Sequence, residues 1–132
     1  MPNRVLVVDD DPILRAIVLE ILSGHDLDCA EAADGRLALE MLQRQAFDLV
    51  VLDMLMPGKD GVEVITALRD RWPAIRILAI SGGGGSVSSD NLLNIADAMG
   101  ADAVMEKPLR QAGFLECVLG LLAKGGERLS AN

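Results

Sequence analysis

The sequence RVLVVDDDP, residues 4–12, sets a buried strand directly against a cluster of negative charge. Residues 5–8 are all valine or leucine, and Asp9, Asp10 and Asp11 follow at once. Two carboxylates about 4 Å apart repel each other by roughly 4 kcal/mol at an effective dielectric constant near 20. A divalent cation would reverse the sign of that energy. The stretch therefore predicts a strand that ends in a metal site.

Four further apolar runs follow, and amphipathic patterns typical of helices separate them. The predicted strands are residues 5–8, 28–32, 49–52, 75–80 and 103–105. Pro12 suits the first turn of a helix, Gly24 and Gly100 suit helix ends, and Asp60 with Glu63 resembles a capping box. One apolar stripe, residues 13, 14, 17, 18, 21 and 22, marks the first helix. This alternation predicts an α/β fold with a doubly wound, five-stranded parallel sheet.

Composition narrows the class of protein. The 132 residues suit one domain, which we place at residues 1–124, with a flexible C-terminal tail at 125–132. The net charge of −8 and the scarcity of aromatic residues argue against a nucleic-acid partner. No apolar run is long enough for a membrane span. Cys29 and Cys117 lack metal-ligand spacing, so buried, reduced thiols in a cytoplasmic protein are expected.

Polar residues end the later strands, at the edge where doubly wound folds bind ligands. Asp53, Ser81 and Lys107 end the third, fourth and fifth apolar runs. Hard oxygen ligands favour Mg²⁺, or Mn²⁺, over Zn²⁺. Asp53 can serve as a nucleophile that forms an acyl phosphate, with Ser81 and Lys107 as donors to the phosphoryl oxygens. Asp11, unlike the pair Asp9 and Asp10, is better explained as an acid at a helix N-terminus than as a metal ligand.

The glycine run at residues 82–85 resembles a phosphate-binding loop, but no Lys-Ser or Lys-Thr pair follows it. A dinucleotide-binding loop should follow the first strand, where aspartates stand instead. We interpret the run as a strand–helix loop whose backbone amides can approach a phosphoryl group.

The motifs LVVDDDP, LDMLMPGKDG, ISG and EKP occur in this order and resemble the receiver domain of bacterial two-component response regulators, of the stand-alone chemotaxis type. The resemblance covers residues 4–124. It implies a flavodoxin-like fold with strand order 2-1-3-4-5. It also implies roles at the site: Asp9 and Asp10 as the acidic pair with Asp10 a direct metal ligand, Asp53 as the phosphorylated residue, the backbone carbonyl of Leu55 as a metal ligand, Ser81 as the hydroxyl position and Lys107 as the phosphate-pairing lysine.

The resemblance further implies a signalling module that takes a phosphoryl group from a histidine kinase or a phosphotransfer protein and hydrolyses it slowly, without turning over a separate substrate. Output would pass by protein contact through the face of the fourth helix, fifth strand and fifth helix, in a monomer or a weak homodimer formed through that face. The chain departs from the family at Val104, where receivers commonly carry Tyr or Phe. Leu55 and Gly83, at positions that tune access of water in the family, are non-polar.

Two other classes of protein were weighed. A hydrolase of the haloacid-dehalogenase type also uses an aspartyl nucleophile, but it requires a second acid two residues later, where Leu55 stands. A flavodoxin-like electron carrier requires a hydroxyl-rich loop after the first strand and aromatic residues for the flavin, and the sequence lacks both.

Overall fold

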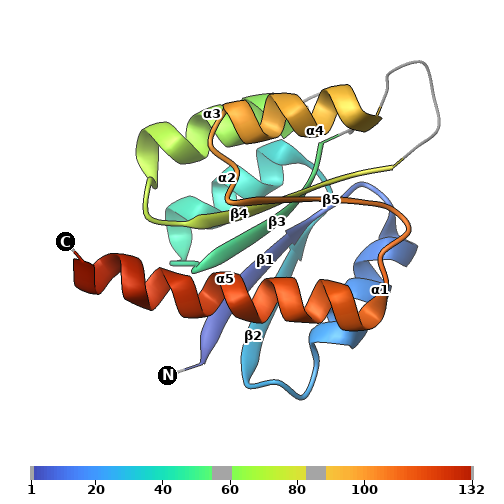
Figure 1. Ribbon diagram of the computed structural model, residues 1–132, viewed down its shortest axis with the longest axis horizontal. Helices are drawn as coiled ribbons and strands as arrows, with labels where there is room; N and C mark the ends of the chain where they lie inside the picture. Colours follow the sequence, from blue (N-terminus) through green and yellow to red (C-terminus); the bar gives the residue numbers. More distant parts are fainter. Residues whose placement is uncertain (1, 55–60, 83–88, 132) are drawn as a thin grey trace.

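The computed structural model describes residues 2–54, 61–82 and 89–131, and the side chains of residues 2–54, 61–82 and 94–123. Strands and helices alternate along these described parts of the chain (Figure 1). The strands are β1 (Asn3–Val8), β2 (Leu27–Ala32), β3 (Leu49–Asp53), β4 (Arg76–Ser81) and β5 (Ala103–Glu106). The helices are α1 (Pro12–Leu22), α2 (Gly35–Arg44), α3 (Gly61–Arg71), α4 (Ser89–Ala98) and α5 (Gln111–Ala131).

The strands form one parallel sheet in the order β2-β1-β3-β4-β5. Helices α2, α3 and α4 lie on one side of this sheet, and α1 and α5 lie on the other (Figure 1). The predicted doubly wound fold and strand order are therefore confirmed. Strand order reverses direction between β1 and β3, so the crevice beyond their carboxyl ends is the expected ligand site.

Two apolar cores hold the layers together, because successive strand residues point to opposite faces. Leu6, Val50 and Ile77 pack in the core beneath α2, α3 and α4. Val5, Val51 and Leu78 pack in the core beneath α1 and α5. Every residue of β3 and β4 is buried, which explains why these two strands read as continuous apolar runs in the sequence.

Helix α1 buries less of its apolar stripe than the sequence predicts. Val18, Ile21 and Leu22 are buried, but Ile13 is 71% exposed and Ile17 is 48% exposed. The two exposed isoleucines line a surface groove of about 780 Å³, closed on its other side by Leu109 and Gln111 at the start of α5. The stripe is therefore divided between the core and an open apolar surface.

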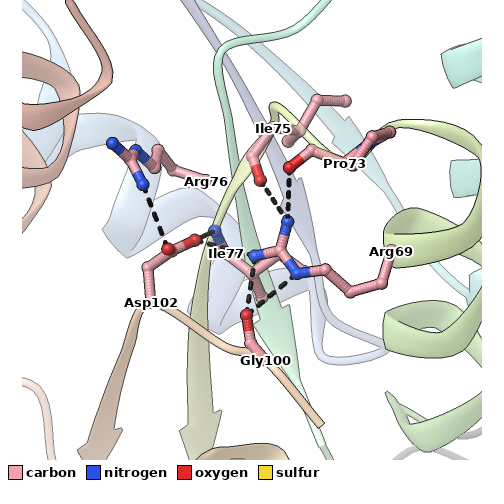
Figure 2. A network of polar contacts seen from close by, with 7 residues as sticks. All are labelled: Arg69, Pro73, Ile75, Arg76, Ile77, Gly100 and Asp102. Atoms are coloured by element: carbon pink, nitrogen blue, oxygen red, sulfur yellow. Dashed lines mark hydrogen bonds and ion pairs between the residues drawn. The ribbon is translucent and has the colours of Figure 1, made fainter. Parts of the chain in front are cut away.

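A polar network stabilises the amino-terminal edge of the sheet (Figure 2). Asp102 accepts hydrogen bonds from Arg69 at 2.8 Å, from Arg76 at 3.2 Å and from the backbone N–H of Ile77 at 2.8 Å. Arg69 also donates to the carbonyl of Gly100 at 2.7 and 2.9 Å. The network ties α3 and the α4–β5 turn to the start of β4, at the edge opposite the predicted ligand site.

Further findings concern the C-terminal helix, the cysteines, the predicted capping box and membrane-spanning helices. Helix α5 continues to Ala131, over residues for which the sequence predicts a tail, and the domain boundary at 124 and the mobility of 125–132 stay predictions. Cys29 and Cys117 are partly rather than fully buried. Asp60 of the predicted capping box lies outside the described residues. None of the described helices is long and apolar enough to cross a membrane.

Candidate metal and phosphoacceptor site

Three carboxylates meet at the carboxyl-terminal edge of the sheet. Asp9, Asp10 and Asp53 each offer a ligand oxygen, and these oxygens lie within 4.8 Å of one another. Strands β1 and β3 pair with Val8 opposite Leu52, which brings the next residues, Asp9 and Asp53, side by side. Asp9 is 4% and Asp53 is 5% exposed, whereas Asp10 is exposed to solvent. The predicted metal ligands among the described residues therefore converge on one point.

A lysine and a serine complete this edge. The Lys107 ammonium lies 3.5 Å from Asp9 Oδ2 and 3.6 Å from Asp53 Oδ2. The Lys107 backbone N–H donates to the Ser81 carbonyl at 2.9 Å, which fixes the lysine beside β4. Ser81 is fully buried, and its Oγ has no hydrogen-bond partner among the described residues. A buried hydroxyl without a partner is unfavourable by about 1–3 kcal/mol, so Ser81 is ready to donate to a group that enters the site.

The loop after β1 separates the roles of its three aspartates. The Asp9 N–H donates to the Ala32 carbonyl at 3.2 Å, and Asp9 Oδ1 accepts from the Asp11 N–H at 2.9 Å. Asp11 is the N-cap of α1, and its side chain accepts from the Ile13 N–H at 2.9 Å. Asp11 therefore caps a helix outside the carboxylate cluster, as the alternative interpretation of its sequence position holds.

Two residues that shape the site were missed from the sequence. A Cβ on Gly61, the first residue of α3, would lie 2.6 Å from Met54 Cα and 3.1 Å from the Asp53 carbonyl, so only glycine lets α3 begin against the end of β3. Arg15 of α1 donates from Nη1 to the Asp9 carbonyl at 2.6 Å. The low helix propensity of glycine applies to helix interiors, so it gave no signal for Gly61 at the first position of α3.

The donor set fits a small, hard divalent cation. Its described members are carboxylate oxygens, without the imidazole or thiolate ligands that favour zinc. Cations of this kind, above all Mg²⁺, are held by one or two carboxylates with water and phosphate oxygens. The cluster leaves Asp10 open to solvent, as that coordination requires. Leu55, whose carbonyl is the other predicted ligand, and Gly83 lie outside the described residues.

Fold and site together define a flavodoxin-like domain with a carboxylate-rich cation site at its switch point. The family model of the response regulator receiver domain matches residues 5–118, and the chain belongs to this family. Receiver domains are phosphoacceptor signalling modules that histidine kinases phosphorylate, and they bind Mg²⁺ through acidic residues. The hydrolase and flavodoxin interpretations are thereby excluded.

Individual relatives agree with this assignment. The chain is 34% identical to the transcriptional regulatory protein AfsQ1 of Streptomyces coelicolor, over 100% of its own length and 56% of that protein. It is 28% identical to the chemotaxis protein CheY4 of Vibrio cholerae, with a TM-score of 0.80 over 92% of this chain and 99% of that one. A CheY-like receiver from Methanospirillum hungatei superposes with a TM-score of 0.87 over 97% of this chain and 99% of that one, at 22% identity, which shows the fold alone. The chain spans about half or less of the length of the curated relatives it matches.

Proposed function

We propose that the chain acts as a Mg²⁺-dependent response-regulator receiver whose phosphoacceptor is Asp53. The observation that carries this assignment is the position of the Asp53 carboxylate, buried beside Lys107 and within 4.8 Å of the ligand oxygens of Asp9 and Asp10. A buried carboxylate between a cation and a metal-ligand pair is a nucleophile set among groups that neutralise phosphoryl oxygens.

Each residue has a distinct role in the transfer. An oxygen of Asp53 attacks the phosphorus of a phosphohistidine, so an O–P bond forms as the P–N bond breaks and the imidazole leaves. The Lys107 ammonium pairs with one phosphoryl oxygen, and the Ser81 hydroxyl donates to another. Asp9, Asp10, Asp53 and the Leu55 carbonyl would hold Mg²⁺, or Mn²⁺, which would supply positive charge that offsets the negative charge of the phosphoryl group.

Protein partners supply and receive the signal in this proposal. The donor is a histidine kinase or a phosphotransfer protein, and the exposed apolar groove of Ile13 and Ile17 supports docking of a protein next to the site, since α1 begins two residues after Asp10. Output passes by protein contact through α4, β5 and α5. Ile95 on α4 and Val104 on β5 are 43% and 39% exposed and give these packed elements an apolar outer face.

The chain turns over no separate substrate, so the proposal is tested by its own modification. The protein is incubated with Mg²⁺ and acetyl phosphate, and intact-mass spectrometry measures the phosphoryl adduct. We expect one adduct in the wild type, none in Asp53→Asn, and none when EDTA replaces Mg²⁺. Asp70→Asn, an exposed carboxylate on α3, is the matched control and should keep the wild-type yield. An adduct at normal yield in Asp53→Asn would refute the assignment.

A further inference from the structure

The side chain of Arg15 turns back from α1 towards the β1–α1 loop. It is 15% exposed, and its guanidinium makes two contacts from different nitrogens. Nη1 donates to the backbone carbonyl of Asp9 at 2.6 Å, and Nε donates to Glu31 Oε1 at 2.7 Å. Glu31 lies on β2, opposite Val7 of β1. The arginine therefore bridges the loop that carries the carboxylates to the neighbouring strand.

The contacted carbonyl belongs to the peptide that joins Asp9 to Asp10. Two backbone donors of this turn are already engaged, since the Asp9 N–H donates to the Ala32 carbonyl and the Asp11 N–H donates to Asp9 Oδ1. Asp10 is exposed, and no hydrogen bond or ion pair with the described residues anchors its side chain. The orientation of the Asp9–Asp10 peptide, and hence the direction in which the Asp10 carboxylate leaves the chain, depends on what holds the Asp9 carbonyl.

Among the described residues, two positively charged side chains contact the carboxylate cluster or its loop, and they act differently. Lys107 lies against the carboxylate oxygens of Asp9 and Asp53 and so occupies space that a metal or a phosphoryl group would share. Arg15 contacts the main chain behind the carboxylates and takes no ligand position. Its planar fork can hold two acceptors in fixed directions, which an ammonium group cannot do.

We propose that Arg15, braced by Glu31, is a positioning residue that orients the Asp9–Asp10 peptide and thereby sets the Mg²⁺ affinity of the site. This inference rests on the proposed metal site and extends it to two residues outside the carboxylate cluster. Partners that orient metal ligands typically change metal affinity by about 10–100-fold when they are removed.

The positioning role and a purely electrostatic effect predict opposite changes in Mg²⁺ affinity when Arg15 is replaced. Removing a positive charge beside a cation site would tighten Mg²⁺ binding if charge alone mattered. If Arg15 acts by orientation, Arg15→Gln raises the dissociation constant for Mg²⁺ by about tenfold or more. Arg15→Lys can still donate to the Asp9 carbonyl but cannot hold both acceptors in fixed directions, so under the positioning role its affinity should lie between those of Arg15→Gln and the wild type.

Glu31 provides a second, independent variant that leaves Arg15 in place. Glu31 is 48% exposed, so Glu31→Ala should fold normally even where Arg15→Gln does not. We expect a smaller loss of Mg²⁺ affinity in Glu31→Ala, and no further loss when it is added to Arg15→Gln, because Glu31 acts through Arg15. Independent charge effects would instead add in the double variant.

The experiment is a titration of each folded protein with Mg²⁺ alone, followed by the amide shifts of residues 9–11 in NMR spectra. Arg44→Gln, which removes the same charge from the exposed last turn of α2, is the control and should stay within twofold of the wild type. Unchanged or tighter Mg²⁺ binding by Arg15→Gln, or additive losses of affinity in the double variant, would overturn the positioning role. The metal site itself would stand in that case, provided that the wild type binds Mg²⁺ and that Asp10→Asn does not. If Mg²⁺ binding by the wild type does not depend on Asp10, both the metal site and the positioning role are overturned.

Discussion

Replacing Asp10 with asparagine should make the protein more stable than the wild type without metal. When Mg²⁺ is abundant, the same variant should be less stable than the wild type. In the metal-free state, three carboxylates lie at one edge of the sheet with their ligand oxygens within 4.8 Å of one another. Asparagine has nearly the shape of aspartate without its charge. The change therefore removes like-charge repulsion and, in the same step, a metal ligand.

The magnitude follows from the separation of the oxygens. At 4.8 Å, two unit charges repel by about 0.9 kcal/mol in bulk water and about 3.5 kcal/mol at an effective dielectric constant near 20. Asp10 is exposed, so the value for water applies, and its pairs with Asp9 and Asp53 sum to about 2 kcal/mol. Lys107 and dissolved salt offset part of this repulsion. We expect a gain of about 1 kcal/mol, or a rise in Tm of about 4 °C for a domain of this size.

Thermal unfolding, measured by circular dichroism in EDTA and then in rising Mg²⁺, tests both halves of the prediction. At about 100 times its dissociation constant, Mg²⁺ stabilises the wild type by about 2.7 kcal/mol. This gain exceeds the advantage of Asp10→Asn, so the order of the two Tm values should reverse during the titration.

The control variant is Asp11→Asn, which removes the same charge one residue further along the chain. Asp11 caps α1, and asparagine caps helices about as well as aspartate. Its Tm should shift with Mg²⁺ as much as that of the wild type. Equal Mg²⁺ shifts in Asp10→Asn and the wild type would show that the metal binds elsewhere. A lower Tm of Asp10→Asn in EDTA would show that repulsion at the cluster is negligible.

Two further predictions concern residues away from the site. Asp102→Ala breaks the partly buried contacts with Arg69, Arg76 and the Ile77 N–H, and should lower the free energy of unfolding by about 3 kcal/mol in urea titrations. Glu40→Ala breaks the exposed pair with Arg36 and should change the free energy of unfolding by less than about 0.5 kcal/mol. A similar, small effect of both substitutions would contradict a stabilising role of the Asp102 network. Burial, and secondarily the Asp28 carboxylate, raise the pKa of the Cys29 thiol, so less of the thiol is ionised at a given pH. Alkylation of Cys29, measured by mass spectrometry, should therefore be slower than that of a free cysteine, should accelerate only at higher pH, and should be faster in Asp28→Asn. A rate equal to that of free cysteine would contradict the raised pKa.

The sheet was predictable from sequence because its strands are covered on both faces. Strands β3 and β4 are buried throughout and read as continuous apolar runs. Their ends were harder to place, since Asp53 and Ser81 belong to the strands rather than follow them. Asp53 still pairs with Ile80, and Ser81 with Glu106. Backbone pairing continues past the point where side chains turn polar, and hydrophobic pattern reports only the side chains.

Helix α1 shows a second limit of prediction from hydrophobic patterns. The apolar stripe of the sequence includes Ile13 and Ile17, yet both are exposed. Periodicity identifies the face of a helix that is apolar, not how much of that face the rest of the domain covers. Here an open groove remains between α1 and the start of α5, and Ile13 and Ile17 line it together with Leu109 and Gln111.

At the candidate site, sequence reasoning brought together the residues that end strands but not those that support them. Asp9, Asp53 and Lys107 could be placed at one edge because parallel strands share their carboxyl ends. Arg15 reaches the site from a helix and is braced by Glu31 on β2, a contact between elements that pattern in one segment does not encode. The buried state of the Ser81 hydroxyl likewise depends on the packing of neighbouring strands.

The two edges of the sheet carry opposite contributions to stability. At the amino-terminal edge, Asp102 joins opposite charges and a backbone donor in a satisfied network. At the carboxyl-terminal edge, like charges lie close together, and the Ser81 hydroxyl is buried without a partner among the described residues. Both features raise the free energy of the empty domain, and a bound cation and phosphoryl group would relieve both. The site is therefore held in place by the rest of the fold, and ligand binding is linked to a gain in stability. If Asp53 is phosphorylated as proposed, this linkage would allow the added charge to shift the equilibrium between conformations of the whole domain.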